Sequence, residues 1–169
     1  MRMTTEAEKL IRTKHTNKMP GKELEDHIAQ FLKTQNMCVL ATCKDNIPRA
    51  TPVEYYSHGT TLYVMPTEGQ KMENIRHNRI VSVAVFAPYV NWLSVKGVQI
   101  SGEATLLTQE SKEFKEALAV YKWEKSAKEI GISNIPKTFK LLKIVPHAIE
   151  VLDISLKHKG YAPRQMWSP

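Results

Sequence analysis

The sequence contains no hydrophobic run long enough to cross a membrane, since a membrane helix needs about 18 consecutive apolar residues. Its first residues, Met1 to Glu8, also lack the apolar stretch of a signal peptide. Hydrophobic residues make up 42% of the chain and charged residues 24%, which is ordinary for a globular protein. We therefore expect a soluble, cytoplasmic protein with no membrane partner.

Cysteine is scarce, and Cys38 and Cys43 are the only two. If both lie on one strand, their odd separation directs them to opposite faces of the sheet, so no disulfide is expected between them. The pair also lacks the C-x-x-C spacing and the neighbouring histidines of a zinc site. We predict two inert thiols and no metal centre.

Acidic residues are outnumbered, and the formal net charge is +7. The excess belongs to the two ends: residues 1–22 hold six Lys or Arg against two Glu, and residues 156–169 hold three against none. Such ends could attract nucleic acid or an acidic partner, but solvated termini are the commoner explanation. Because no helix-turn-helix, zinc-finger or RNA-recognition pattern is present, we expect no nucleic-acid partner.

The 169 residues suffice for one domain, which at about this size buries roughly 68–70% of the surface of its unfolded chain. Residues 1–21 are predicted to form a basic N-terminal arm or loose helix, with helix formers over residues 4–13. Residues 22–155 are predicted to form the folded domain. Residues 156–169 form a basic, aromatic C-terminal tail that either stays disordered or folds over the site.

Three further segments have helical character. Lys22–Thr34 places Leu24, Ile28, Phe31 and Leu32 on one apolar face, so this helix should cap the core. A short helix is expected over Gly69–His77. A longer amphipathic helix is expected over Thr108–Lys128, with Thr108 and Ser111 as candidate N-terminal caps.

Six segments read as strands because they are rich in β-branched, aromatic or alternating apolar residues and are separated by turn formers. Gly97 and Gly102 are expected at bulges or bends, and a further bulge is expected at Pro146-His147. Six strands with short connections indicate a mainly β (α+β) protein with a closed antiparallel barrel and flanking helices. The strands are Met37–Cys43, Pro48–Ser57, Thr61–Met65, Ile80–Phe86, Lys96–Leu107 and Phe139–Ile154.

The most suggestive chemical feature is the segment from Thr67 to Lys71, between the third strand and the short helix. A hydroxyl, the free N–H groups of a first helical turn and a lysine could converge there on one phosphate. Arg49, near the start of the second strand, could add a bidentate contact. Two plainer explanations stay open: Thr67 and Gln70 fit a capping box, and Arg49 could be a solvated strand end.

The order of these motifs resembles the pyridoxamine 5'-phosphate oxidase-like FMN-binding split-barrel family over roughly residues 22–155. The resemblance is carried by Cys38-Val39-Leu40-Ala41-Thr42, Pro48-Arg49-Ala50-Thr51-Pro52-Val53, Leu62-Tyr63-Val64, Thr67-x-x-x-Lys71 with Ile75, and Val98-x-x-x-Gly102-Glu103-Ala104. It implies a six-stranded antiparallel split β-barrel that works as a homodimer with FMN at the interface.

The resemblance also implies the cofactor contacts. The FMN phosphate would be held by Arg49, Thr67 and Lys71, with Gln70 helping. Backbone groups of Thr51, Pro52 and Val53 would border the flavin ring, Met65 and Pro66 would lie near the ribityl chain, and Trp92 and Gln99 would come from the second subunit. For Trp92, ordinary packing is an equally good explanation.

The C-terminus departs from the true oxidases, which carry a tryptophan followed by an R-x-H-x-R signature, because this chain stops two residues after Trp167. Oxidation of vitamin B6 is therefore doubtful. We expect an FMN-dependent oxidoreductase that passes electrons from a nicotinamide donor to a small acceptor, with its catalytic residues unidentified. The alternatives are a flavin-binding electron carrier or sensor, a haem-binding protein with His158 as axial ligand, and a deazaflavin in place of FMN.

Overall fold

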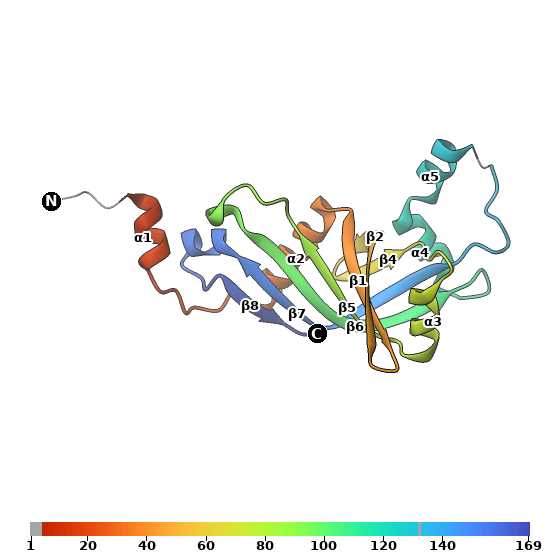
Figure 1. Cartoon of the computed structure of the whole chain (residues 1–169). Helices are drawn as coiled ribbons and strands as arrows, with labels where there is room; N and C mark the ends of the chain where they lie inside the picture. Colours follow the sequence, from red (N-terminus) through yellow and green to blue (C-terminus); the bar gives the residue numbers. More distant parts are fainter. Residues whose placement is uncertain (1–4, 132) are drawn as a thin grey trace.

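The computed structural model describes residues 5–131 and 133–169. In this part of the chain an eight-stranded antiparallel sheet curls around the core, and helices flank it (Figure 1). The strand order is β2-β1-β5-β6-β7-β4-β3, with β8 paired to β7. The strands are β1 Met37–Lys44, β2 Ile47–Glu54, β3 Tyr56–His58, β4 Thr61–Val64, β5 Ile80–Phe86, β6 Lys96–Leu107, β7 Leu141–Asp153 and β8 Arg164–Trp167. The helices are α1 Glu6–Arg12, α2 Gly21–Thr34, α3 Gln70–His77, η1 Trp92–Ser94, α4 Phe114–Tyr121, α5 Trp123–Ile130 and η2 Ile154–Lys159.

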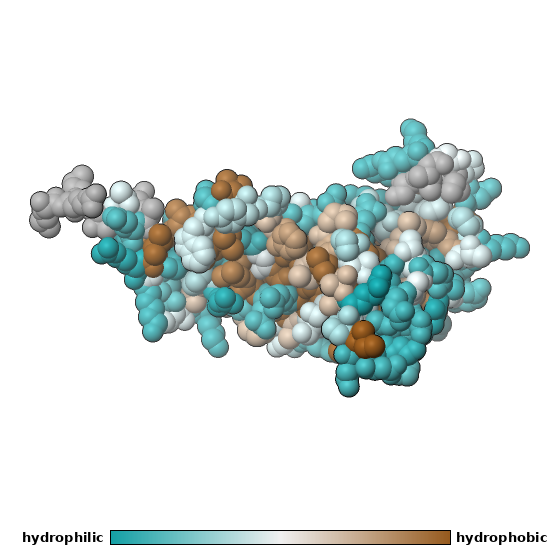
Figure 2. Space-filling view, in the orientation of Figure 1, coloured by the Kyte–Doolittle hydropathy of each residue, from teal (hydrophilic) through white to brown (hydrophobic). Residues whose placement is uncertain are grey.

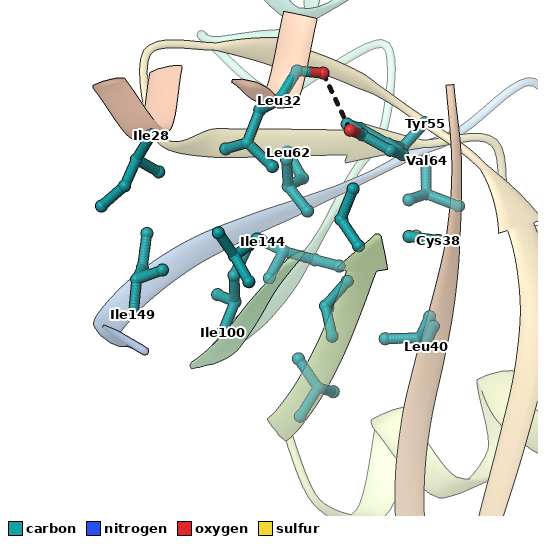
Figure 3. Packing of buried hydrophobic residues seen from close by; sticks show 14 of the residues in the cluster. Ile28, Leu32, Cys38, Leu40, Tyr55, Leu62, Val64, Ile100, Ile144 and Ile149 are labelled. Atoms are coloured by element: carbon teal, nitrogen blue, oxygen red, sulfur yellow. Dashed lines mark hydrogen bonds between the residues drawn. The ribbon is translucent and has the colours of Figure 1, made fainter. Parts of the chain in front are cut away.

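The sheet is a split barrel and not the closed barrel that the strand pattern alone favoured. Its two edge strands, β2 and β3, follow each other in the chain, yet no ladder joins them within the described residues. Between them Tyr55 is 1% exposed and donates its hydroxyl to Leu32 O of α2 at 2.8 Å (Figure 3). The chain turns inward at Tyr55, and this separates the two edges.

The predicted fold class is confirmed, but the expected six strands are eight. The segment Pro48–Ser57 is not one strand, because the inward turn at Tyr55 divides it into β2 and β3. The second addition is β8, which lies in the C-terminal tail and pairs along the end of β7, where Leu152 faces Arg164 and Ile149 faces Trp167. The other strands follow one another along the chain as predicted.

The long β6–β7 ladder is interrupted by a bulge. Its register shifts between Ser101 and Gly102. Ser101 pairs with Ala148 and Gly102 pairs with Pro146, so His147 is the extra residue of a bulge. At Gly102 a Cβ atom would lie 2.5 Å from Val145 O, closer than any real contact allows. The bulges expected at Gly102 and Pro146-His147 are confirmed. The ladder passes Gly97 without a register shift.

The core lies between the concave face of the sheet and α2. All four apolar residues predicted for the inner face of this helix are buried, and Ile28 and Leu32 are fully enclosed. Leu40, Leu62 and Ile100, from three strands, belong to the same buried cluster (Figure 3). The helix therefore caps the core as its periodicity predicts.

A buried carboxylate fixes the far end of the sheet to this helix. Asp153 is 1% exposed and accepts from His27 Nε2 of α2 and from Lys96 Nζ of β6, both at 2.9 Å. Burial alone would raise the pKa of Asp153, but hydrogen bonds from His27, Ser155 and Lys96 outweigh it and hold the pKa well below its usual range. The carboxylate thus ties together α2, β6, β7 and η2.

The helix predicted over Thr108–Lys128 is wrong in two respects. It begins only at Phe114, and neither Thr108 nor Ser111 caps it. Ser111 Oγ instead accepts a hydrogen bond from Thr108 N, ahead of the helix. It is also broken at Lys122, whose backbone is left-handed with φ 56°. The break lets Tyr121, at the end of α4, and Trp123, at the start of α5, both pack on Phe139.

The two chain ends pack on each other. The helix expected over residues 4–13 is present as α1, although residue 4 lies outside the described residues. Lys157 Nζ of η2 donates to the carbonyls of Leu10 and Ile11 at the end of α1. Further along, Met19 N donates to the buried Gln165 of β8. The C-terminal tail is therefore an ordered part of the sheet, and it does not cover the loop between β4 and α3.

Within the described residues no helix is both long and apolar enough to span a membrane. Cys38 and Cys43 are free thiols on β1, the first buried and the second half-buried. Burial raises the pKa of Cys38 to about 12, so this thiol stays protonated at neutral pH.

We predict that Gly102→Ala lowers the free energy of unfolding by about 1–3 kcal/mol, because the new methyl group would force β7 away from β6. Gly21→Ala is the matched control, since nothing lies within 4 Å of its Cβ position and its backbone is helical. Urea denaturation of both variants measures the difference. Equal stability of the two variants would show that the close approach at Gly102 is not a constraint.

Candidate functional site

The loop between β4 and α3 holds a buried cation. Lys71, in the first turn of α3, is 7% exposed, and its Nζ donates to Thr67 O at 2.9 Å and to Thr67 Oγ1 at 2.6 Å. Both acceptors are neutral oxygens. No carboxylate of the described residues lies within ion-pair distance of this ammonium group, and Glu68, which pairs with Arg76, acts on it only at longer range.

The capping box that Thr67 and Gln70 could have formed is not present. The N-cap of α3 is Gly69, which has φ 132° and makes no side-chain cap. The first backbone bond of the helix runs from Met72 N to Gly69 O at 3.0 Å, so the N–H groups of Gln70 and Lys71 precede it. The hydroxyl of Thr67 is directed to Lys71 instead of to the helix backbone.

A chain of buried polar contacts fixes α3 against the sheet. Gln70 Nε2 donates to Asn74 Oδ1 at 3.0 Å, and Asn74 Nδ2 donates to Thr42 Oγ1 of β1 at 3.1 Å. Asn74 and Thr42 are 2% and 3% exposed. In the β1–β2 ladder Thr42 lies directly opposite Arg49, so the same contacts bring the N-terminal half of α3 close to Arg49.

Arg49 and Gln70 line one groove of about 370 Å³. Arg49 is exposed and forms no ion pair within the described part of the chain. Lys44, on the same groove, pairs with Glu73 at 2.6 Å, and their hydrogen bond lowers the pKa of Glu73 and raises that of Lys44. The groove is completed by Asp45, Ile47, Pro48 and Asn74.

The three candidate residues that follow on β2 alternate between the faces of the sheet. Thr51 and Val53 are paired with the buried Leu40 and Cys38 and share their inner face, while Pro52 is exposed on the outer one. Thr51 Oγ1 is buried and has no hydrogen-bond partner in the described protein. A buried hydroxyl of this kind is costly unless another group satisfies it.

Met65 and Pro66 occupy the short link between the end of β4 and Thr67. Met65 is 42% exposed and Pro66 is half-buried. They therefore lie directly beside the Thr67–Lys71 pair, as their place in the sequence requires.

Of the candidate residues only Arg49 and Gln70 line the Arg49 groove, and two of the others, Gln99 and Trp92, lie on different elements. Gln99 lies on the outer face of β6, in a row of directly opposed residues that runs from Pro52 through Val39 and Ala84 to Gln99. Three strand spacings of about 4.8 Å separate the two ends of this row. Trp92 is 60% exposed in η1, on the β5–β6 connection. Within one chain, neither residue can share a phosphate with Arg49.

Sequence reasoning missed Lys44 and Asn74. Lys44 lies just outside the predicted strand Met37–Cys43, and Asn74 lies within the short helix predicted over Gly69–His77. A signal for Lys44 existed, because a two-residue turn at Asp45-Asn46, both with left-handed backbones, pairs position 44 with 47 and position 42 with 49. Nothing in the sequence indicated that Asn74 would bond to Thr42.

The sequence profile of the family described as pyridoxamine 5'-phosphate oxidase matches residues 24–153. No curated protein matches the chain. A provisionally assigned pyridoxamine 5'-phosphate oxidase from Listeria innocua is 29% identical, and the match covers 77% of this chain and 98% of that one with a TM-score of 0.62. The resemblance found in the sequence is thereby confirmed.

More distant solved structures share the fold. An FAD-binding protein from Mesorhizobium loti is 20% identical over 75% of this chain and 89% of that one, with a TM-score of 0.60. A haem storage protein from Vibrio cholerae is 17% identical over 73% of this chain and 89% of that one, with a TM-score of 0.59. At these identities the likeness shows the architecture alone.

We predict that Asn74→Ala lowers the free energy of unfolding by about 1–3 kcal/mol, because it leaves the buried Thr42 hydroxyl without its donor. Thr42→Val should have a similar cost. The double variant should lose about 1 kcal/mol less stability than the sum of the two single losses, because both substitutions remove the same contact. Additive losses would mean that the two side chains do not interact in solution.

Proposed function

Because the chain belongs to the pyridoxamine 5'-phosphate oxidase family, we propose that it binds FMN, with the phosphate held by Arg49, Thr67 and Lys71. The observation that carries the proposal is the buried ammonium group of Lys71, whose hydrogen-bond acceptors are both neutral. A buried charge is stable only when it is paired, and a phosphate supplies two negative charges at that point. The free backbone N–H groups of Gln70 and Lys71, at the start of α3, would donate to the same phosphate.

The residues present fit the whole cofactor. Arg49 provides a planar, bidentate donor from β2, and Gln70 is fixed beside it by Asn74. The ring would lie along the backbone of Thr51, Pro52 and Val53. Met65 and Pro66 would contact the ribityl chain.

We further propose that the protein works as a homodimer, in which a second copy covers the outer face of the sheet. Hydrophobic residues gather on this face over β5, β6 and β7 (Figure 2). Ile80, Phe86 and Met166 are exposed by 55%, 60% and 61%. Because Pro52 and Gln99 share this face, a partner placed on it would bring its own Gln99 and Trp92 toward the flavin ring.

The proposed activity is that of an FMN-dependent oxidoreductase that passes electrons from a nicotinamide donor to a small acceptor. FMN would accept a hydride and return electrons singly or in pairs. The protein would bind the phosphate, fix the ring against β2 and exclude water through the second copy. None of the residues that line the Arg49 groove is a histidine or a cysteine, which agrees with chemistry performed by the cofactor.

The first test is the visible spectrum of the purified protein, with mass spectrometry of any released chromophore. We expect flavin bands and FMN. Replacing Arg49 or Lys71 by Met should each weaken FMN binding roughly 10- to 100-fold, the effect of removing one hydrogen bond to a charged group. Fluorescence titration of the cofactor-free protein measures this.

Lys33→Met is the control, because Lys33 is an exposed lysine of α2 outside the groove. It should leave FMN affinity unchanged. A protein that takes up deazaflavin but not FMN would correct the cofactor and keep the phosphate site. A Soret band that is lost in His158→Ala, with no flavin uptake, would replace the proposal by haem binding.

Turnover is tested separately on the FMN-loaded protein. We expect oxidation of NADH or NADPH in the presence of nitroaromatic or quinone acceptors, and parallel loss of FMN and of activity in Lys71→Met. If bound FMN is reduced by a partner protein but no small acceptor is turned over, the protein is an electron carrier or sensor and not an oxidoreductase.

A further inference from the structure

The connection between β6 and β7 is far larger than the fold requires. These strands are antiparallel neighbours, and such strands are normally joined by two to five residues. Here residues 108–140 form α4, α5 and a returning segment (Figure 1). The connection has its own hydrophobic cluster, distinct from the main core, in which Phe114, Tyr121, Trp123 and Phe139 pack together. Long connections with their own structure are commonly functional.

A groove of about 580 Å³ lies in the angle between the two helices. Lys115, Leu118, Ala119 and Lys122 have the spacing of one face of α4 and form one wall. Trp123 begins α5, and Ile135 closes the groove from the returning segment. Leu118 and Ile135 pack on the aromatic cluster, so the floor of the groove is apolar.

The rim of this groove is positively charged. It carries Lys115, Lys122 and Lys125, and Glu124 is its one acidic lining residue within the described chain. Lys125 lies 3.9 Å from Glu129, but both side chains are largely exposed and such a pair is weak. Lys122 Nζ lies over the ring of Tyr56 at 5.7 Å. No carboxylate neutralises Lys115 or Lys122 through an ion pair among the described residues.

We propose that this groove binds a small organic anion with an apolar body, such as a hydrocarbon or an aromatic ring that bears a carboxylate, sulfonate or phosphate. The volume is that of a small-molecule site and not of a docking surface for a protein. The apolar floor would bury the body of the ligand, and the lysines would pair with its charge. The groove shares no residue with the Arg49 groove, so the inference goes beyond the proposed flavin function.

The test uses the full-length protein and the probe 8-anilinonaphthalene-1-sulfonate, whose fluorescence rises on transfer to an apolar site. Decanoate, below its micelle-forming concentration, should displace the probe. Decan-1-ol, which has the same body without the charge, and acetate, which has the charge without the body, should each be weaker by roughly tenfold or more. Equal displacement by decanoate and decan-1-ol would overturn the role of the lysines.

Two variants place the site. Lys115→Gln with Lys122→Asn should weaken decanoate roughly tenfold while leaving decan-1-ol unchanged, and Asn tolerates the left-handed backbone of position 122. Ala119→Trp should fill the groove and abolish displaceable binding of both, and circular dichroism checks that it folds. Lys33→Gln on α2 is the control and should change nothing.

If the double lysine variant and Ala119→Trp both bind decanoate like the wild type, the ligand site is elsewhere and the proposal is wrong. FMN content is recorded for every protein. Loss of FMN affinity in the Arg49 and Lys71 variants, with decanoate binding intact, would show that the two sites bind their ligands independently.

Discussion

The architecture depends on the close approach of two backbones at Gly102. The β6–β7 ladder is the longest in the sheet, and it bends where Val145 O lies too near Gly102 for any side chain. One end of this ladder carries the α4–α5 connection, and the other carries Asp153, which binds α2 and β6. On the edge that faces away from β6, β7 pairs with β4 and β8. The bend at Gly102 therefore sets the positions of β4 and β8.

The candidate cofactor site is built from short polar contacts around α3. Thr67 holds Lys71, Asn74 holds Gln70, and Thr42 holds Asn74. The β1–β2 register then places Arg49 opposite Thr42, and Arg49 shares a groove with Gln70 and Asn74. Each contact is local, but the set spans β1, β2, β4 and α3. The result joins the buried ammonium group of Lys71, through α3, to the exposed Arg49 on the edge strand β2.

Much of the fold could be predicted because it follows from local pattern. The apolar face of α2, the bounds of β5 and β6, and the bulge at Pro146-His147 each depend on residues close together in the sequence. The errors share the opposite property. Tyr55 divides a strand because Leu32, in another element, accepts its hydroxyl, and Lys122 breaks a helix so that Phe139 can pack between aromatic residues.

The sequence by itself determined the fold class, the order of the elements and the phosphate-binding candidates Arg49, Thr67 and Lys71, because periodicity and motif order are carried by neighbouring residues. Only the tertiary structure decided that Thr67 bonds to Lys71 and not to the helix backbone, and that Lys44 and Asn74 line the groove of Arg49 and Gln70. It also decided that Pro52 and Gln99 share the outer face. These facts depend on strand register and on which buried polar groups find partners, and both are settled only when the whole sheet closes over its core.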